Sequence, residues 1–219
     1  AKVKSVTAAG IELETARGCS RCVTGGCSFC TEPFYGMPRQ RDPAGIFAET
    51  AALFAAGARH FRLGRQPDLL AYGVSGGEFP CPDADKLRTL FSGIRSAAPE
   101  LETLHIDNIN PGTIARHEDA ARDALAEIVA GHTAGDIAAF GVESADPAVI
   151  SANNLKGMPD MIFRAVEIVN EVGGVRNRGI PELLPGLNFI SGLAGETEQT
   201  FAENRAFLQR IFDAGLLVR

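Results

Sequence analysis

The chain has 219 residues, of which 45% are hydrophobic and 22% charged, so it can bury one full core, and one domain (1–219) is the simplest count. Its formal net charge of −6 argues against a surface that wraps a nucleic-acid duplex, since affinity for phosphate comes from clustered lysine and arginine. No apolar run approaches membrane-spanning length, and we expect a protein of the reducing cytoplasm with no membrane partner.

Short apolar segments alternate with amphipathic ones along the whole chain. Period-two and apolar patterns predict strands at 11–16, 60–63, 101–106, 136–142 and 187–190. Caps and helical periodicity predict helices at 42–57, 83–98, 115–131, 158–172 and around 201–212. The last four residues resemble the first half of a sixth strand, and the chain begins without Met, so we expect a fragment of a longer protein.

This alternation predicts an α/β fold in which helices cover a parallel sheet, either a barrel or a doubly wound sheet. In both folds, ligands bind at the carboxyl ends of the strands. Unusual polar or glycine-rich segments follow five of the predicted strands, at 19–30, 64–68, 107–110, 143–144 and 192–196. We therefore expect these segments to surround one mouth, which indicates an active site.

Four of the five cysteines are crowded into one loop: Cys19, Cys22, Cys27 and Cys30. Such density indicates metal binding or redox chemistry. The alternatives are a disulfide pair, a zinc site, a plant-type [2Fe–2S] site, a thioredoxin-like pair, and a [4Fe–4S] cluster on three cysteines with one iron open. The two cysteine pairs are closer together than in zinc ribbons, and a plant-type site needs a fourth ligand. A three-cysteine cluster at the mouth of a parallel barrel agrees best with the predicted fold.

Several segments resemble the radical SAM superfamily over nearly the whole chain. They are Gly18-Cys19 at a strand end, Cys27-Ser28-Phe29-Cys30, and the segments 63–73, 140–146 and 188–197. The pattern most resembles an uncharacterised, mostly archaeal radical SAM group with a methylthiotransferase-like core. The resemblance implies a partial (β/α)6 TIM-like barrel, truncated here near the sixth strand, a [4Fe–4S] cluster, and S-adenosylmethionine bound to the open iron.

The cysteine spacing departs from the usual Cys-x3-Cys-x2-Cys of this family. The chain offers Cys19-x7-Cys27-x2-Cys30, or the same last two ligands with Cys22 in first place. We favour Cys19, because it directly follows the strand and Gly18, and Cys22 is its alternate. Two consecutive glycines at 25–26 would let the longer loop fold back, since glycine tolerates the necessary φ values.

The resemblance also implies a set of cofactor contacts: Phe29, Gly64, Arg65, Gln66, Glu143, Ser144, Ile190 and Gly192. Glu143 and Ser144 would bind the ribose and the methionine end, or would instead cap the helix that follows. Ile190 and Gly192 would lie under adenine, or would be ordinary core. Lys156 either pairs with the methionine carboxylate or is a solvated surface lysine. The segment 76–78 spells a family motif but falls late after its strand, and we interpret it as a turn.

The function that follows is reductive cleavage of S-adenosylmethionine to a 5′-deoxyadenosyl radical, with an electron from a ferredoxin- or flavodoxin-like donor. The radical would abstract hydrogen from a substrate that no residue identifies, and no catalytic residue is assigned beyond the cluster. Methylthiolation is the nearest analogy, resting on fold alone. The alternatives are a non-catalytic iron–sulfur module for electron transfer or sensing, and a zinc-stabilised binding domain.

Overall fold

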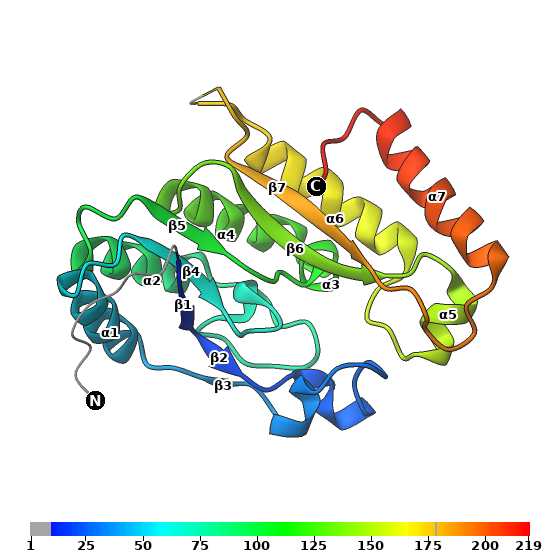
Figure 1. The fold of residues 1–219 in the computed structure, drawn as a ribbon, viewed down its shortest axis with the longest axis horizontal. Coiled ribbons are helices and arrows are strands. Elements are labelled where there is room, and N and C mark those ends of the chain that lie inside the picture. The colour runs from blue at the N-terminus through cyan, green and yellow to red at the C-terminus, as the bar shows by residue number, and fades with distance from the viewer. Residues whose placement is uncertain (1–9, 178) are drawn as a thin grey trace.

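The computed structural model describes residues 10–177 and 179–219, in which strands and helices alternate (Figure 1). The predicted domain, 1–219, also includes residues 1–9 and 178, which lie outside the described part. The main strands are β1 (Ile11–Glu14), β4 (His60–Gly64), β5 (Thr103–Ile106), β6 (Asp136–Glu143) and β7 (Leu183–Phe189). The long helices are α1 (Pro43–Ala55), α2 (Ala84–Ala97), α4 (Glu118–Gly131), α6 (Pro159–Gly173) and α7 (Glu198–Asp213). The short elements are β2 (Ala16–Arg17), β3 (Arg39–Gln40), α3 (Pro111–Arg116) and α5 (Pro147–Ala152).

The main strands lie side by side in the order in which they occur along the chain. Parallel pairing joins β1 to β4 and β4 to β5, and a second parallel pair joins β6 to β7. An isolated parallel bridge between Asn108 and Ala139 connects the two groups. There the Ile109 amide donates to the Ala139 carbonyl at 3.1 Å, and the Ala139 amide donates to the Asp107 carbonyl at 3.0 Å. The predicted α/β fold with parallel strands is therefore confirmed.

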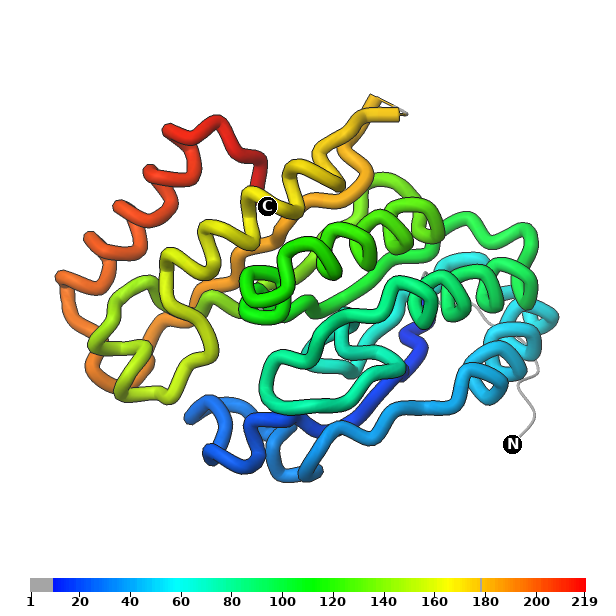
Figure 2. Tube along the Cα trace, turned by 180° about the vertical axis from the view of Figure 1, so that it is seen from behind, coloured from blue at the N-terminus to red at the C-terminus, as the bar shows by residue number. Residues whose placement is uncertain are grey.

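Helices α1, α2, α4 and α6 cover one face of these strands, and each packs on the next (Figure 2). Alternate strand residues, such as Leu13, Phe61, Leu63 and Phe140, are buried in the core between strands and helices. The intervening residues of β1 and β4 face the other way, and those of β4 include the exposed Arg62. A doubly wound sheet would carry helices on both faces and would reverse its strand order. The arrangement here does neither.

The helix predicted at 115–131 is in fact two helices, α3 and α4, separated at His117. Asn110 caps α3 by accepting a hydrogen bond from the Gly112 amide at 3.0 Å, and Pro111 occupies the first turn. His117 has φ −132° and ψ 53°, which no helix contains. Its ring nitrogen Nε2 lies 3.0 Å from the Phe79 carbonyl oxygen. This contact with a distant loop stabilises the non-helical backbone of His117. The local periodicity does not reveal the contact.

Strand β7 begins four residues earlier than predicted and contains Pro185. Pro185 pairs in register with Ala138 of β6, and its carbonyl oxygen accepts a hydrogen bond from the Arg219 amide at 2.9 Å. Because the amide and carbonyl of a strand residue point to the same side, the missing N–H of Pro185 faces away from β6. The Leu187 amide in turn donates to the Arg219 carbonyl oxygen at 2.7 Å. The last residue therefore hydrogen-bonds to β7 in the parallel pattern.

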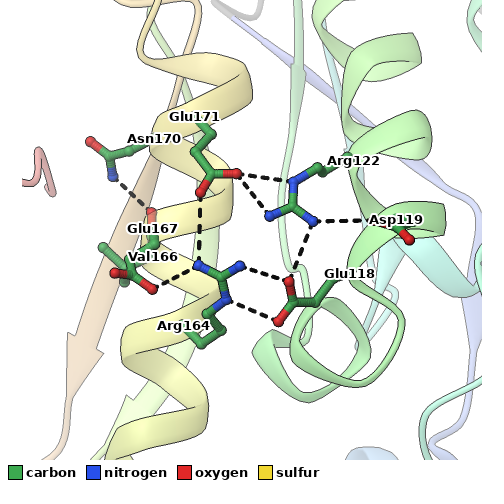
Figure 3. Close-up of polar contacts among 8 residues, drawn as sticks. All are labelled: Glu118, Asp119, Arg122, Arg164, Val166, Glu167, Asn170 and Glu171. Carbon is green, nitrogen blue, oxygen red and sulfur yellow. Dashed lines mark hydrogen bonds and ion pairs between the residues drawn. The ribbon is translucent and has the colours of Figure 1, made fainter.

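An ion-pair network joins α4 to α6 on the outside of the helix layer (Figure 3). The guanidinium of Arg164 donates to Glu118 at 2.7 and 2.9 Å, and Arg122 contacts Glu171 at 2.9 Å. Hydrogen bonds from Arg164 lower the pKa of the half-buried Glu118 to about 2. Within the part of the chain that the structure describes, no helix combines the length and hydropathy needed to cross a membrane.

Candidate active site

A cavity of about 600 Å³ lies where the strands end, between their carboxyl ends and the cysteine loop. The cysteine loop contributes Cys19, Cys27, Phe29 and Cys30. The segments after β4 and β5 contribute Arg65, Gln66, Pro67, Asp68, Asp107, Asn108 and Asn110, and β6 contributes Gly141 and Glu143. From β7 only Asn188 lines the cavity, and the segment 192–196 does not reach it. The expected mouth therefore exists, but without its fifth segment.

The cysteine loop leaves the sheet after β1 and is closed at its base by antiparallel pairing of β2 with β3. The Cys19 amide donates to the Gly36 carbonyl at 3.0 Å. Gly18 has φ +98°, and a Cβ there would lie 2.6 Å from the Gly36 carbonyl oxygen, so only glycine fits. Gly25 and Gly26 have φ +87° and +72°. The return of the longer loop therefore uses the left-handed glycines that its sequence predicts.

Three of the four clustered thiols share the cavity. Cys19, Cys27 and Cys30 line it, whereas Cys22 does not. Burial raises the pKa values of the Cys19 and Cys27 thiols. The Arg21 backbone amide opposes this shift at Cys19, and the positive charges of Arg21 and Lys156 oppose it at both thiols. All five cysteines are free.

Thiolates are the ligands that iron–sulfur clusters use, so the donor set fits such a cluster in its chemistry, and all three thiols line one cavity. As the side chains stand, however, the described residues contain no group of three or more His, Cys, Asp or Glu that could hold a metal ion. The thiols therefore share a cavity without forming a closed site.

Two of the predicted cofactor contacts, Arg65 and Glu143, have an unusual backbone. Both have φ +65°, and both line the cavity at strand ends. Non-glycine residues in this region store strain of about 1–3 kcal/mol, which proteins retain mostly at functional sites. Burial raises the pKa of Glu143, and Lys156 opposes this shift. A Cβ on Gly141 would lie 2.4 Å from Glu143 Oε1 and 3.2 Å from Lys156 Nζ, so carboxylate and ammonium crowd over this glycine at the cavity wall.

Three other predicted cofactor contacts, Gln66, Ser144 and Gly64, are covered by other parts of the protein. The Gln66 side chain is 2% exposed, accepts from the Thr15 hydroxyl and donates to the Leu63 carbonyl, both at 3.1 Å. Ser144 is buried and accepts a hydrogen bond from the Asp146 amide at 3.1 Å, whereas the cap of α5 is Asp146 itself, which accepts the Ala148 amide at 2.8 Å. Gly64 ends β4 beneath the side chain of Glu12. Gln66 borders the cavity, but it and Ser144 have protein partners.

The segment predicted to bind adenine, 190–192, packs near the cysteine loop but does not line the cavity. Ile190 packs against the same small apolar cluster as Cys27, a cluster made of Val149, Ile150, Leu155 and Leu193. The Ile190 amide donates to the Glu143 carbonyl at 3.0 Å. Gly192 has φ +90° and open space around its Cα, and its amide donates to Glu196 at 2.7 Å. Ile190 and Cys27 thus share one apolar cluster, and neither Ile190 nor Gly192 lines the cavity. Phe29 lines the cavity and is 44% exposed.

A pair of asparagines that sequence reasoning missed fastens the cysteine loop. The Asn153 carbonyl accepts the Ser28 amide at 3.0 Å, and its side chain accepts the Ser28 hydroxyl at 2.8 Å. Asn153 also donates to the Ala194 carbonyl at 2.8 Å. Asn154 donates to the Thr24 and Gly26 carbonyls at 3.0 and 2.7 Å. The only local signal is an Asn-Asn pair after a short helix, since asparagine tolerates the left-handed φ of +50° that Asn154 adopts.

Two further parts of the cavity wall were not predicted as cofactor contacts. The segment 76–78 lies in an irregular loop with a bend at 77–78, and it also lines the cavity. Asp68 is buried there and accepts hydrogen bonds from the Asn110 amide at 3.1 Å and the Thr113 hydroxyl at 2.5 Å. Burial raises the pKa of Asp68 to about 6.

No family model matches the chain. It is 47% identical over 213 residues to an uncharacterised protein of Methanocaldococcus jannaschii, covering 95% of this chain and 39% of that protein. It is 29% identical over 188 residues to the ribosomal protein uS12 methylthiotransferase RimO of Thermus thermophilus, covering 84% of this chain and 39% of RimO. The chain therefore spans about two fifths of the length of these curated relatives.

Two solved structures share the fold. The cobalamin-dependent S-adenosylmethionine radical enzyme OxsB, with aqua-cobalamin and S-adenosylmethionine bound, has a TM-score of 0.64 at 17% identity, over 92% of this chain and 26% of OxsB. Coproporphyrinogen III oxidase HemN from Escherichia coli, a radical SAM enzyme, has a TM-score of 0.52 at 16% identity, over 93% of this chain and 41% of HemN. The resemblance to radical SAM enzymes and to uncharacterised archaeal proteins is thus confirmed. At 16–17% identity, the two solved structures show similarity of the fold alone.

Proposed function

We propose that the chain is the core domain of a radical SAM enzyme, a partial (β/α)6 barrel in which Cys19, Cys27 and Cys30 hold a [4Fe–4S] cluster. Such a cluster, when bound, supplies one electron that splits S-adenosylmethionine into methionine and a 5′-deoxyadenosyl radical, which takes a hydrogen atom from substrate. The chain itself supplies the thiolates, the cavity and the groups that orient S-adenosylmethionine. The single observation that carries the proposal is that these three thiols, and not Cys22, line the cavity where the strands end.

The surroundings of the cysteine loop suit both ends of S-adenosylmethionine. Lys156 and Glu143 lie together on the wall, where an ammonium and a carboxylate can pair with the carboxylate and amino groups of a methionine. Ile190 does not line the cavity, but it packs on the same apolar cluster as Cys27 and so offers an apolar surface for adenine near the cysteine loop. Arg65 and Phe29 also line the cavity and can contact S-adenosylmethionine there.

The proposal extends to the surroundings of the enzyme. A ferredoxin- or flavodoxin-like protein would deliver the electron, and the five free thiols suit a reducing cytoplasm. Because RimO is a methylthiotransferase and is similar to this chain, methylthiolation is the reaction class to test first. That similarity is the support for it, and none of the cavity residues identifies the substrate.

Anaerobic reconstitution of the protein with iron and sulfide, followed by iron analysis and an assay for 5′-deoxyadenosine, tests the proposal. We expect Cys19→Ala, Cys27→Ala and Cys30→Ala each to lose the cluster and the activity. Cys22→Ala and Cys81→Ala are matched controls that should retain both. Loss of iron in Cys22→Ala with retention in Cys19→Ala would reverse the choice of first ligand. Zinc in place of iron in the purified protein, or a cluster that never cleaves S-adenosylmethionine, would contradict the enzymatic function.

A further inference from the structure

Arg21 is a buried arginine inside the cysteine loop, between Cys19 and Cys22 in the sequence. Only 9% of its side chain is exposed, and it lines the cavity. Burying a guanidinium is costly unless partners compensate for the water that it loses. A loop that needed only to fold could leave this side chain in solvent. The burial of Arg21 therefore indicates a role beyond folding of the loop.

The partners of Arg21 come from two loops that are distant in the sequence. One terminal nitrogen, NH1, pairs with the carboxylate of Glu78, in the loop after β4. The other, NH2, donates to the Asn154 carbonyl at 2.6 Å and to its side-chain oxygen at 2.9 Å. Asn154 in turn holds the Thr24 and Gly26 carbonyls of the cysteine loop. The guanidinium is therefore fixed in place, at the junction of three loops.

The third nitrogen of the guanidinium, Nε, is buried and has no hydrogen-bond partner. An unpaired N–H in a buried cation leaves part of its charge uncompensated by neighbouring oxygens. Arg21 lines the same cavity as the Cys19, Cys27 and Cys30 thiols, so its charge lies close to the position of the proposed cluster. Lys156 is a second cation at the cavity, and it lies beside the carboxylate of Glu143.

We propose that Arg21 is a positioning residue whose fixed positive charge sets the reduction potential of the cluster, with Glu78 as the counter-charge that limits this effect. The inference rests on the proposed function. Reduction adds one electron, and so one negative charge, to a cluster already held by three thiolates. A cation nearby stabilises the reduced form more than the oxidised form and raises the potential, whereas an anion lowers it.

The test is a one-electron redox titration with dithionite of the anaerobically reconstituted protein, followed by electron paramagnetic resonance. Arg21→Gln removes the cation and leaves Glu78 unpaired, so the potential should fall. Glu78→Gln removes the anion and leaves the cation unpaired, so the potential should rise. Both variants break the same ion pair, so a merely structural role predicts the same effect for both. Shifts of opposite sign are the signature of charge.

Two further variants complete the series. Arg21→Lys keeps the charge and should bring the potential back towards the wild-type value. Asn154→Ala removes the hydrogen bonds that fix Arg21 and the cysteine loop, without changing the charge. It should therefore lower the amount of iron retained and leave the potential of the retained cluster near that of the wild type. Equal potentials in all variants, or a shift of the same sign in Arg21→Gln and Glu78→Gln, would overturn the inference. If Arg21→Gln holds no cluster, a Glu78→Gln potential that fails to rise overturns it. A wild-type protein that takes up no [4Fe–4S] cluster would instead overturn the proposed function.

Discussion

Replacing Asp68 with asparagine should stabilise the fold at neutral pH and lose this advantage in acid. Asp68 Oδ1 accepts the Leu70 and Asn110 amides, both at 3.1 Å, and Oδ2 accepts the Thr113 hydroxyl at 2.5 Å. An asparagine at this position keeps the first oxygen, and its amide group can donate to the Thr113 hydroxyl oxygen. The variant therefore preserves the three contacts and removes only the buried charge.

The size and sign of the effect follow from the pKa of Asp68, which burial raises from 3.8 to about 6. At 1.36 kcal/mol per pH unit, this rise corresponds to about 3 kcal/mol. Because the folded chain binds the proton more tightly than the unfolded chain, the contribution of Asp68 to stability is fully present below about pH 4. It is lost as the pH rises through about 6. The gain of Asp68→Asn over the wild type should therefore grow by up to about 3 kcal/mol between pH 4 and pH 7 and then level off.

Urea denaturation of both proteins at a series of pH values measures this difference. Thr113→Val is a companion variant, because the Thr113 hydroxyl lowers the pKa of Asp68 by binding its ionised form. Its loss should move the wild-type transition to higher pH. A stability difference between Asp68→Asn and the wild type that stays constant with pH, or that grows towards acid, would refute the reasoning.

Three other changes have defined outcomes. Gly18→Ala should lower the free energy of unfolding in urea by about 1–3 kcal/mol, and by more than Gly25→Ala. Both positions have positive φ, but only at Gly18 would the added Cβ also lie 2.6 Å from a carbonyl oxygen. Equal losses in the two variants would show that this close approach is unimportant. Arg164→Gln should lower the melting temperature slightly at low salt, and the difference should disappear in 1 M salt because the network is exposed, so a salt-independent loss would point to packing instead. Ile190→Ser should weaken S-adenosylmethionine binding about tenfold by calorimetry while preserving cluster absorbance, and unchanged affinity would place adenine elsewhere.

The helix and strand order could be predicted because the signals for it are local. Asp42 and Asp83 cap α1 and α2 through amides two residues away, as their positions before the helices indicate. The division between α3 and α4 escaped prediction for the opposite reason. His117 sits in a continuous helical pattern, and only its contact with the Phe79 carbonyl, 38 positions away, accounts for the break.

The same distinction between local and long-range signals applies to the candidate site. The sequence alone determined that four thiols share one loop, that glycines allow the loop to return, and that polar residues follow parallel strands, because each is a matter of spacing. Only the tertiary structure decided which thiols line the cavity, because spacing allows either Cys19 or Cys22 as first ligand and the strand end only favours Cys19. It also decided that Arg21 is buried and that Asn154 holds it across 133 positions. Such contacts form only when the strands bring distant loops together, and no local pattern encodes them.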